Sequence, residues 1–265
     1  ASIREAAGCR CRRLHVTESP LGEVRMFKVP EPAKERWRSI MWTKLVNQML
    51  GRDTLLPTVF VTRKQDEDRT MAAECQVTLD FKYWYNQFVL GPELKAQFCF
   101  ADSSNQRWAL TRMPTGQRHA VEVAVQATNR ILNFEYPKSL SVTPYIDNVR
   151  IAGPRGLVAE TAAKFFERCV ACGAELNDLS LTPQSSKAEV LEEMTNLQST
   201  RGEWLGVLHD LSAKTVELGS KTVEKLHALK KRWTQSTSMS AKLLASACGL
   251  AIYRSGVLGV NLQPK

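Results

Sequence analysis

The stretch SVTPYIDNVRIAG, residues 141–153, contains the feature on which the interpretation of this chain depends. A short apolar strand is predicted to end at Tyr145-Ile146, Asp147-Asn148 to form a tight turn, and Val149-Arg150-Ile151-Ala152 to return as a second strand. Turns that contain Asp and Asn are common, because these side chains tolerate the left-handed backbone and bond to nearby amides. A single carboxylate at this turn is therefore compatible with an ordinary hairpin as well as with a chemical role.

The composition of the 265-residue chain is that of a globular protein, with 43% hydrophobic and 24% charged residues. This length allows one large domain or a few subdomains. The net charge of +9 favours a polyanionic partner, either nucleic acid or an anionic membrane surface. No apolar run approaches the roughly 20 residues of a membrane span. The sequence also lacks the G-x-G-x-x-G, G-x-x-x-x-G-K-[ST] and H-E-x-x-H motifs, which argues against the common dinucleotide, P-loop and zinc-protease sites.

The seven cysteines, an odd number in a chain too long to need disulfides, favour a reducing compartment. No secretory signal pattern opens the sequence, so we expect an intracellular protein, cytoplasmic or nuclear. The pairs Cys9/Cys11 and Cys169/Cys172 leave two interpretations open, zinc half-sites or structural thiols. Thiols are favoured because the spacing is not that of two paired C-x-x-C sites. The chain begins at Ala1 rather than Met, and we expect it to be a piece of a longer product.

Hydrophobic periodicity predicts a mixture of helices and antiparallel hairpins, and thus an α+β chain. Residues 1–30 show no strong period and are expected to form an extended or poorly ordered lead-in, and residues 76–90 open as a strand and continue into an aromatic cluster. Hairpins are also predicted at 96–111 and 203–218, and helices at 119–132, 157–172, 220–233 and 239–253. The lysine-rich helix at 220–233 predicts either an ordinary solvated face or a contact with a nucleic-acid backbone.

The pattern of a strand that ends in an acid occurs once earlier, in Val77-Thr78-Leu79-Asp80. If Asp80 and Asp147 end adjacent strands, their carboxylates can hold two divalent metal ions. Such a pair of ions is the apparatus of phosphoryl transfer onto a 3′-hydroxyl. Magnesium fits, since it takes few carboxylates and completes its shell with substrate phosphates and water.

The order of short motifs around these two acids resembles that of the reverse transcriptases of retroelements. The matching segments are RWRSI (36–40) with KLVN (44–47), DFKYWY (80–85), RMPTG (112–116), YIDN (145–148) and WLGV (204–207). Three positions depart from the family pattern: Trp84 replaces Ala, Thr115 replaces Phe or Gln, and Asn148 replaces a second Asp. The spacing and the tail LLASACGLAIYRSGVLG (243–259) look most like tyrosine-recombinase retrotransposons of the DIRS/VIPER type.

The resemblance implies a role for each matched residue. Asp80 and Asp147 would bind two Mg²⁺ ions, with Mn²⁺ as a possible substitute, and Asn148 would assist them in catalysis. Arg38 would hold the incoming triphosphate, and Tyr85 would be the steric gate against a ribose 2′-hydroxyl. The remaining nucleotide-binding positions would be Phe81, Thr115 and Gly116, and those near primer and template Pro114, Tyr145, Trp204, Leu205 and Gly206.

The resemblance also implies a right-hand polymerase fold, with an antiparallel palm sheet backed by helices, fingers and a helical thumb. The expected divisions are a lead-in (1–30), fingers (31–75), palm (76–202, with a finger insertion near 91–118), a primer-grip hairpin (203–218) and a thumb (219–265). The reaction would be RNA-directed DNA synthesis. The partners would be an RNA template, a DNA primer, dNTPs and further polyprotein domains such as RNase H and a recombinase, with no membrane partner.

Asn148 leaves a second hypothesis open. An Asn amide can offer an oxygen to a metal or a water but no negative charge, and losing a unit charge beside a divalent ion costs several kcal/mol. Some viral RNA polymerases nevertheless carry G-D-N at the equivalent turn. The alternative is therefore a catalytically inactive reverse-transcriptase-like domain that serves as an RNA-binding or protein scaffold. An RNA-dependent RNA polymerase is disfavoured by the bulky Tyr85 at the gate position.

Overall fold

A computed structural model of the chain describes residues 11–13, 22–31, 36–50, 60, 63–235 and 240–258. The strands are β1 Cys11–Arg13, β2 Arg25–Glu31, β3 Arg36–Trp42, β4 Cys75–Asp80, β5 Cys99–Ala101, β6 Arg107–Leu110, β7 Ser141–Tyr145, β8 Asn148–Gly153, β9 Arg201–Trp204, β10 Val207–Asp210 and β11 Thr215–Leu218. The helices are α1 Lys44–Met49, α2 Arg63–Met71, α3 Pro92–Gln97, α4 Ala120–Ile131, α5 Arg155–Ala171, α6 Lys187–Asn196, α7 Ser220–Gln235 and α8 Ala241–Leu258, with a 3₁₀ helix η2 at Trp84–Gln87. Among the described residues, no helix is both long and apolar enough to cross a membrane.

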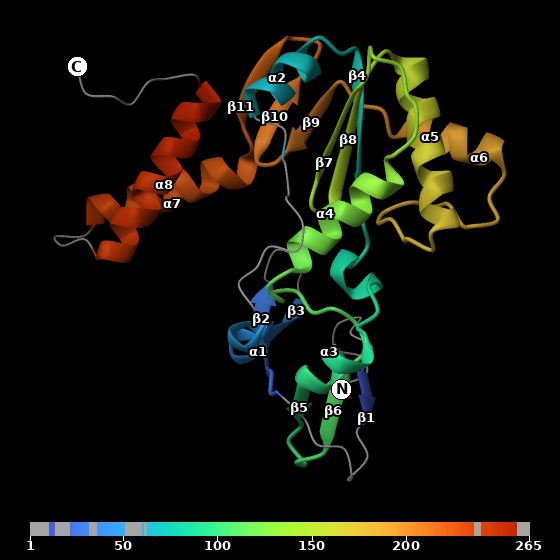
Figure 1. The fold of residues 1–265 in the computed structure, drawn as a ribbon. Helices are drawn as coiled ribbons and strands as arrows, with labels where there is room; N and C mark the ends of the chain where they lie inside the picture. Colours follow the sequence, from blue (N-terminus) through green and yellow to red (C-terminus); the bar gives the residue numbers. More distant parts are fainter. Residues whose placement is uncertain are drawn as a thin grey trace.

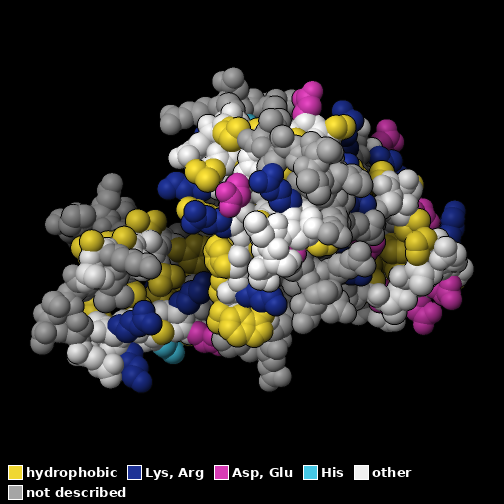
Figure 2. Space-filling view, turned by 90° about the horizontal axis from the view of Figure 1, so that it is seen from below, with side chains coloured by type: hydrophobic (Ala, Val, Ile, Leu, Met, Phe, Trp, Pro, Cys, Tyr) yellow, Lys and Arg dark blue, Asp and Glu magenta, His cyan; other side chains and the backbone are white. Residues whose placement is uncertain are grey.

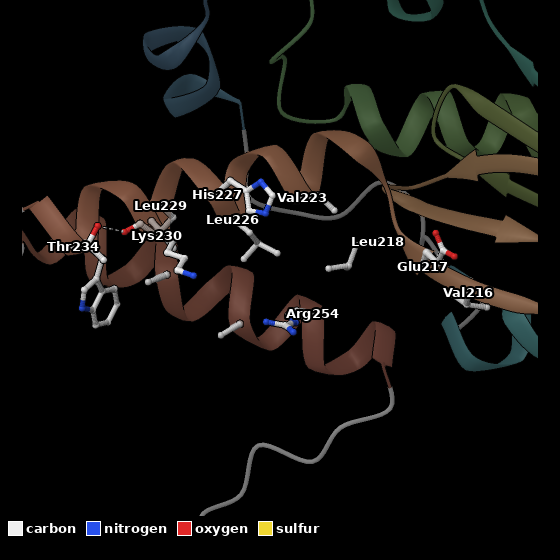
Figure 3. Close-up of a pocket in the computed structure, with 13 residues that line it drawn as sticks. Val216, Glu217, Leu218, Val223, Leu226, His227, Leu229, Lys230, Thr234 and Arg254 are labelled. Atoms are coloured by element: carbon white, nitrogen blue, oxygen red, sulfur yellow. Dashed lines mark hydrogen bonds between the residues drawn. The ribbon is translucent and has the colours of Figure 1, made fainter.

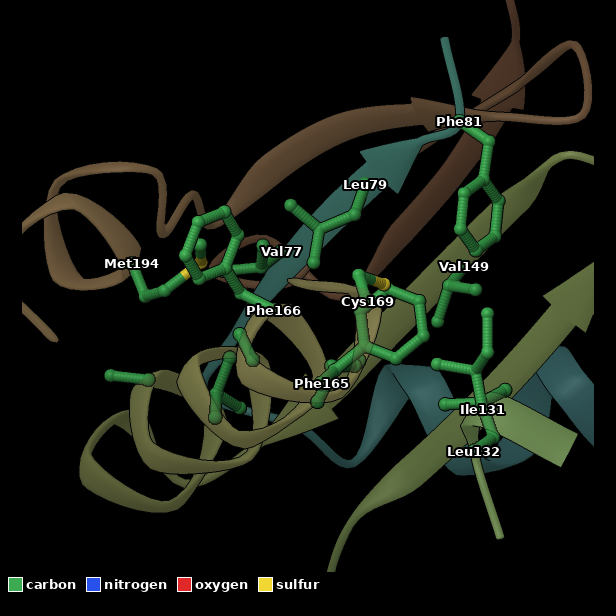
Figure 4. Close-up of a cluster of buried hydrophobic side chains, with 14 of the residues drawn as sticks. Val77, Leu79, Phe81, Ile131, Leu132, Val149, Phe165, Phe166, Cys169 and Met194 are labelled. Carbon is green, nitrogen blue, oxygen red and sulfur yellow. The ribbon is translucent and has the colours of Figure 1, made fainter. Parts of the chain in front are cut away.

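A three-stranded antiparallel sheet in the order β4-β8-β7 forms the centre of the molecule (Figure 1). Successive side chains of a strand point to opposite faces, so Val77 and Leu79 of β4 and Val149 and Ile151 of β8 share one face, in register with each other. This face packs against α4, α5 and α6 in a large buried hydrophobic cluster (Figure 4). Phe165 of α5 is fully buried in this cluster. The sheet is therefore held on one side by a continuous core.

The opposite face of the same sheet is polar and is covered by α2 and by a second sheet, β9-β10-β11. Gln76 exchanges two backbone hydrogen bonds with Ser199, just before β9, which joins the two sheets. Arg150 and Thr143 lie on this face, buried beneath α2. The even-numbered positions of β4 and β8 thus face α2 and the second sheet, and the odd-numbered positions face the hydrophobic core.

The N-terminal elements form a separate group below the central sheet in Figure 1. β2 and β3 pair as a seven-residue hairpin, and β1, β6 and β5 form another three-stranded sheet. Val24, Phe98 and Leu110 belong to a second hydrophobic cluster there. Parts of residues 1–30 form strands, which is the extended one of the two forms predicted for the lead-in, and β2 continues across the predicted boundary at residue 30.

The two C-terminal helices, α7 and α8, project to the side of the molecule in Figure 1. In the view from below, Lys and Arg side chains and hydrophobic side chains both gather on this projecting part (Figure 2). A hollow of about 960 Å³ separates the two helices, and apolar side chains such as Leu226 and Ala251 line it (Figure 3). No residue of α7 is buried.

The structure confirms the predicted mixture of helices and sheets, including helices close to 119–132, 157–172, 220–233 and 239–253. The predicted hairpin at 96–111 is also present, although residues 96 and 97 end α3 rather than beginning a strand. The prediction of a single hairpin at 203–218 is wrong, because β9, β10 and β11 form a three-stranded meander. The arrangement as fingers, palm and thumb stays a prediction.

Candidate active site

The turn between β7 and β8 brings Asp147 to one end of the central sheet. Tyr145 pairs with Asn148 across this turn, so its two central residues are Ile146 and Asp147, one position earlier than the sequence predicted. Ile146 has a φ of +55°, which is unfavourable for a β-branched residue and is found where the surrounding structure enforces it. We call residues 145–148 the Asp147 turn.

Asp80 lies beside this turn. It is the last residue of β4 and pairs with Asn148, and the next amide, that of Phe81, donates to the carbonyl oxygen of Asp147 at 2.8 Å. The sequence-predicted residues Asp80, Asp147 and Asn148 therefore meet at the ends of neighbouring strands. All three are half-buried, so they are held by the sheet and still accessible from solvent.

Two amide side chains contact the two carboxylates. Asn148 donates through Nδ2 to Oδ1 of Asp147 at 2.9 Å, and Asn177 donates through Nδ2 to Oδ2 of Asp80 at 2.8 Å. The backbone amide of Asn177 also donates to the Asp80 carbonyl oxygen. Sequence analysis missed Asn177, because it lies in the connection after α5 and belongs to no recognisable motif. Within the described part of the chain, no cluster of three or more His, Cys, Asp or Glu side chains is arranged to hold a metal ion.

Tyr85 is half-buried near the Asp147 turn. Burial raises the pKa of its phenol, and the negative charge of Asp147 raises this pKa further. The side chain contacts both hydrophobic clusters, so it lies where the N-terminal group meets the central sheet. Tyr85 is thus a neutral, bulky group beside the carboxylate of Asp147.

Phe81 and Trp84 belong to the core instead. Their rings stack with centroids 3.8 Å apart, and both are almost fully buried. The Phe81 ring is therefore part of the core, and the assignment of Phe81 to a nucleotide site stays a prediction. Trp84 donates through Nε1 to Oγ1 of Thr128 at 3.2 Å, and this hydroxyl lies 3.1 Å from the carbonyl oxygen of Ile146. Trp84 thus supports the strained Asp147 turn from below, through α4.

The segment Pro114-Thr115-Gly116 connects the sheet to the N-terminal group. Pro114 is buried, whereas Thr115 and Gly116 are exposed. The Gly116 carbonyl oxygen accepts hydrogen bonds from Oγ1 of Thr43 at 2.7 Å and Nδ2 of Asn47 at 2.8 Å, and its φ of +95° favours glycine. These contacts fix the segment beside β3, where Arg38 pairs with Val29. The side chain of Arg38 lies outside the described part of the structure.

A second tight turn, which we call the Gly206 turn (residues 204–207), connects β9 to β10. Trp204 pairs with Val207, and Leu205 and Gly206 both have positive φ, at +51° and +79°. Leu205 is 45% exposed at the tip, and its carbonyl oxygen accepts a 2.6 Å hydrogen bond from the Tyr253 hydroxyl of α8. A left-handed, exposed leucine is an outlier of the kind that marks functional turns. Tyr145 lies at the other turn, where its ring is 5.2 Å from that of Phe60.

The fold of this chain is similar to that of solved reverse transcriptase structures. A foamy viral protease–reverse transcriptase in complex with double-stranded DNA matches with a TM-score of 0.61 and 13% identity over 92% of this chain and 37% of that one. The same kind of enzyme in complex with an RNA/DNA hybrid matches with a TM-score of 0.62 and 14% identity over 90% of this chain and 28% of that one. The chain has a reverse-transcriptase-like fold. A further complex of that protein with double-stranded DNA gives a TM-score of 0.59 and 14% identity over 92% and 44% of the two chains.

The chain spans less than half the length of each of these reverse transcriptase structures. Neither a protein-family profile nor a curated protein sequence matches it. At such low identity the similarity establishes the fold, and the site residues must be judged on their own geometry.

Proposed function

We propose that this protein is a template-directed nucleotidyltransferase, a reverse transcriptase that extends a DNA primer with dNTPs on an RNA template. The observation that carries this proposal is the meeting of Asp80 and Asp147 at the ends of two paired strands, within a reverse-transcriptase-like fold. The sequence motifs support the same assignment, since all five segments occur in the order of the family.

The donor set at this site is compatible with magnesium. Asp80 and Asp147 offer hard carboxylate oxygens on a half-buried but accessible surface, and Mg²⁺ binds to one or two carboxylates while substrate phosphates and water complete its shell. These two residues would hold the ions, with the amide of Asn148 at the edge of the site. When bound, Mg²⁺ or Mn²⁺ would lower the pKa of the primer 3′-hydroxyl and neutralise charge on the triphosphate.

Tyr85 is proposed to select the sugar. Its ring lies close enough to Asp147 for the carboxylate to raise the phenol pKa, so a nucleotide bound between these groups would bring its ribose against the ring. A 2′-hydroxyl would then meet the ring and be excluded, which favours dNTPs over NTPs. Arg38 is proposed to bind the triphosphate, and Thr115 and Gly116 to shape the pocket that receives the nucleotide.

The Gly206 turn is proposed to position the primer end, together with Pro114 and Tyr145 near the template. The roles of α7 and α8 as a thumb, and of residues 31–75 with the insertion near 91–118 as fingers, follow from the same assignment. Solved neighbours are complexes with double-stranded DNA and with an RNA/DNA hybrid, which supports a duplex as the partner here. An origin in a retrotransposon of the DIRS/VIPER type, with RNase H and recombinase domains elsewhere in the polyprotein, rests on the sequence resemblance.

Primer extension on an RNA template, with Mg²⁺ and with Mn²⁺, tests the proposal. The wild type is compared with Asp147→Ala, with Asn148→Asp and with Glu160→Ala, a control that removes an exposed carboxylate on the far side of α5. We expect extension by the wild type and the control and none by Asp147→Ala. Extension only by Asn148→Asp would mean that the wild-type site is inactive because Asn148 lacks the negative charge of an Asp. No extension by any variant, with intact RNA binding, would refute the enzyme and support the scaffold.

A further inference from the structure

Arg150 is a charged side chain in the interior of the protein. It follows Asn148 by two positions on β8 and therefore lies on the same polar face of the sheet as Asn148 and Asp80. Only 1% of its surface is exposed. Burial of a guanidinium is costly unless partners compensate it, and the surroundings of Arg150 show what those partners are.

The first partner is Asp66 of α2. One carboxylate oxygen of Asp66 binds Nη2 of Arg150, and the other accepts a 2.7 Å hydrogen bond from Oγ1 of Thr143. Thr143 pairs with Arg150 across the β7–β8 hairpin. Asp66 therefore binds both strands of the hairpin that carries the Asp147 turn, and its charge compensates Arg150, whose pKa burial lowers.

The second partner is the indole of Trp204. The guanidinium carbon of Arg150 lies 5.1 Å from the centre of this ring, a distance typical of a cation–π contact. Trp204 is buried, and it closes the Gly206 turn by pairing with Val207. Arg150 thus extends from the β7–β8 hairpin, which carries the Asp147 turn, to the indole of Trp204 at the Gly206 turn.

This arrangement leaves donors unused. Nη1 of Arg150 and Nε1 of Trp204 are buried, and neither has a hydrogen-bond partner among the described residues. An apolar pair of similar volume would fill the same space without these costs, and such replacements are often neutral or stabilising. What the charged group adds is direction, because the guanidinium is held by Asp66 and lies over the Trp204 ring, so it restricts where that ring can lie.

We propose that Arg150, oriented by Asp66, is a positioning residue that sets the Gly206 turn relative to the Asp147 turn through the indole of Trp204. The proposal rests on the proposed function, in which the Gly206 turn holds the primer end and the Asp147 turn holds the catalytic carboxylate. Arg150 touches neither substrate nor metal. It sets the distance and angle at which the primer 3′-hydroxyl meets the nucleotide.

The test uses the variants Arg150→Lys and Arg150→Met/Asp66→Asn. The first keeps the charge and loses the planar guanidinium over the Trp204 ring. The second removes both charges together while leaving an oxygen at position 66 that can accept from Thr143. The control is Arg168→Met, because the Arg168 guanidinium also lies over an aromatic ring, 5.7 Å from that of Phe134, on the helical side of the sheet. Circular dichroism and thermal unfolding establish that each variant is folded.

Two readouts separate positioning from folding. The first is the fluorescence of 2-aminopurine at the primer 3′ end in an RNA/DNA duplex bound without dNTP. The second is single-turnover extension, which gives the maximal rate and the dNTP KM. We expect both Arg150 variants to change the 2-aminopurine signal and to lower the maximal rate at least about tenfold, with the dNTP KM within about twofold. Arg168→Met should match the wild type in both readouts.

Wild-type behaviour of the folded double variant in both readouts would overturn the positioning role and leave Arg150 a structural residue. A wild type that binds the duplex but does not extend it would refute the proposed catalysis alone, and the 2-aminopurine signal would still decide on Arg150. A wild type that does not bind the duplex would refute both, since no primer end would be present to position.

Discussion

The central sheet and the C-terminal helical pair are built in opposite ways. The sheet β4-β8-β7 covers a closed core with α4, α5 and α6, in which side chains such as Phe165 and Ile151 are fully buried. The pair α7–α8 encloses an open apolar hollow, α7 buries no residue, and Trp233 is 50% exposed. Packing fixes the central sheet, whereas the helical pair contacts the β9-β10-β11 sheet, through β11 and through polar contacts at the Gly206 turn.

Under the proposed function, the two regions would meet different demands. Carboxylates that hold metal ions must keep their separation within a fraction of an ångström, and a strand end backed by a continuous core provides that precision. A part of the molecule that follows a moving duplex needs freedom instead, and regions with few buried apolar contacts have low local stability.

The largest expected effect is that of truncating the sheet core. Phe165→Ala removes a fully buried ring and should lower the free energy of unfolding by about 3–5 kcal/mol. Leu226→Ala, which removes a partly exposed side chain at the hollow between α7 and α8, should cost about 1 kcal/mol or less. Urea denaturation of both variants measures the difference. Equal losses would show that the helical pair is as tightly packed as the sheet.

The sheet region could be predicted well from the sequence, because the burial that stabilises it also produces a regular pattern of apolar residues. The alternation in Val77-Thr78-Leu79-Asp80 and the apolar stripe of α5 are direct consequences of burial, so pattern analysis found both and placed Asp80 opposite the Asp147 turn. The helix α6 carried a signal that was overlooked. Ser186 and Glu189 form a reciprocal capping box at its start, and the same residues stand three apart in the sequence.

Other features had no sequence signal. Asn177 meets Asp80 only through the folded chain, and the pairing of Asp66 with Arg150 joins residues 84 positions apart. The family motif that covers Phe81 and Trp84 does not state on which side of the strand end an aromatic ring packs. The burial of both rings could therefore not be predicted from it. The meander at 201–218 was taken for a hairpin because β11 is short and half-exposed, so its apolar pattern is weak.

A smaller effect is expected where the helical pair meets the Gly206 turn. Gly206→Ala would force a side chain into positive φ and bring its Cβ within 2.9 Å of the Tyr253 hydroxyl. Gly173→Ala is the matched control, because Gly173 also has positive φ but has open space around it. We expect Gly206→Ala to cost about 1 kcal/mol more than the control, and to weaken binding of a primer–template duplex about fivefold, as measured by fluorescence anisotropy.

Adding Tyr253→Phe to Gly206→Ala should restore part of the lost affinity, because the clashing oxygen is removed. If both glycine variants bind the duplex equally well, the Tyr253 contact does not set the position of the turn.

A similar but more local effect is expected beneath the Asp147 turn. Thr128→Val preserves the shape of the side chain but removes the hydroxyl that lies between Trp84 and the Ile146 carbonyl oxygen. The loss should be about 1 kcal/mol of stability, the typical value of one hydrogen bond, with faster hydrogen exchange in the Asp147 turn. Thr195→Val is the control, since Thr195 donates only to a carbonyl of its own helix, α6, at the surface. Unchanged exchange in Thr128→Val would mean that packing alone holds the strained Ile146.

The smallest expected effect is a pH dependence in a third region, the β5–β6 hairpin, whose turn is held by hydrogen bonds to one carboxylate. Asp102 accepts hydrogen bonds from the hydroxyl and amide of Ser104 and from the indole of Trp108, and these bonds lower the pKa of its carboxyl to about 2. Because the folded pKa lies below the ordinary value of 3.8, this contribution to stability is present above pH 3.8 and is lost as the pH falls toward 2. The amide chemical shift of Ser104 should therefore titrate with a midpoint near pH 2, and Asp102→Asn should abolish that titration. A midpoint near 3.8 would show that the turn does not hold the carboxylate, and the hairpin would then depend on packing alone, as the sheet does.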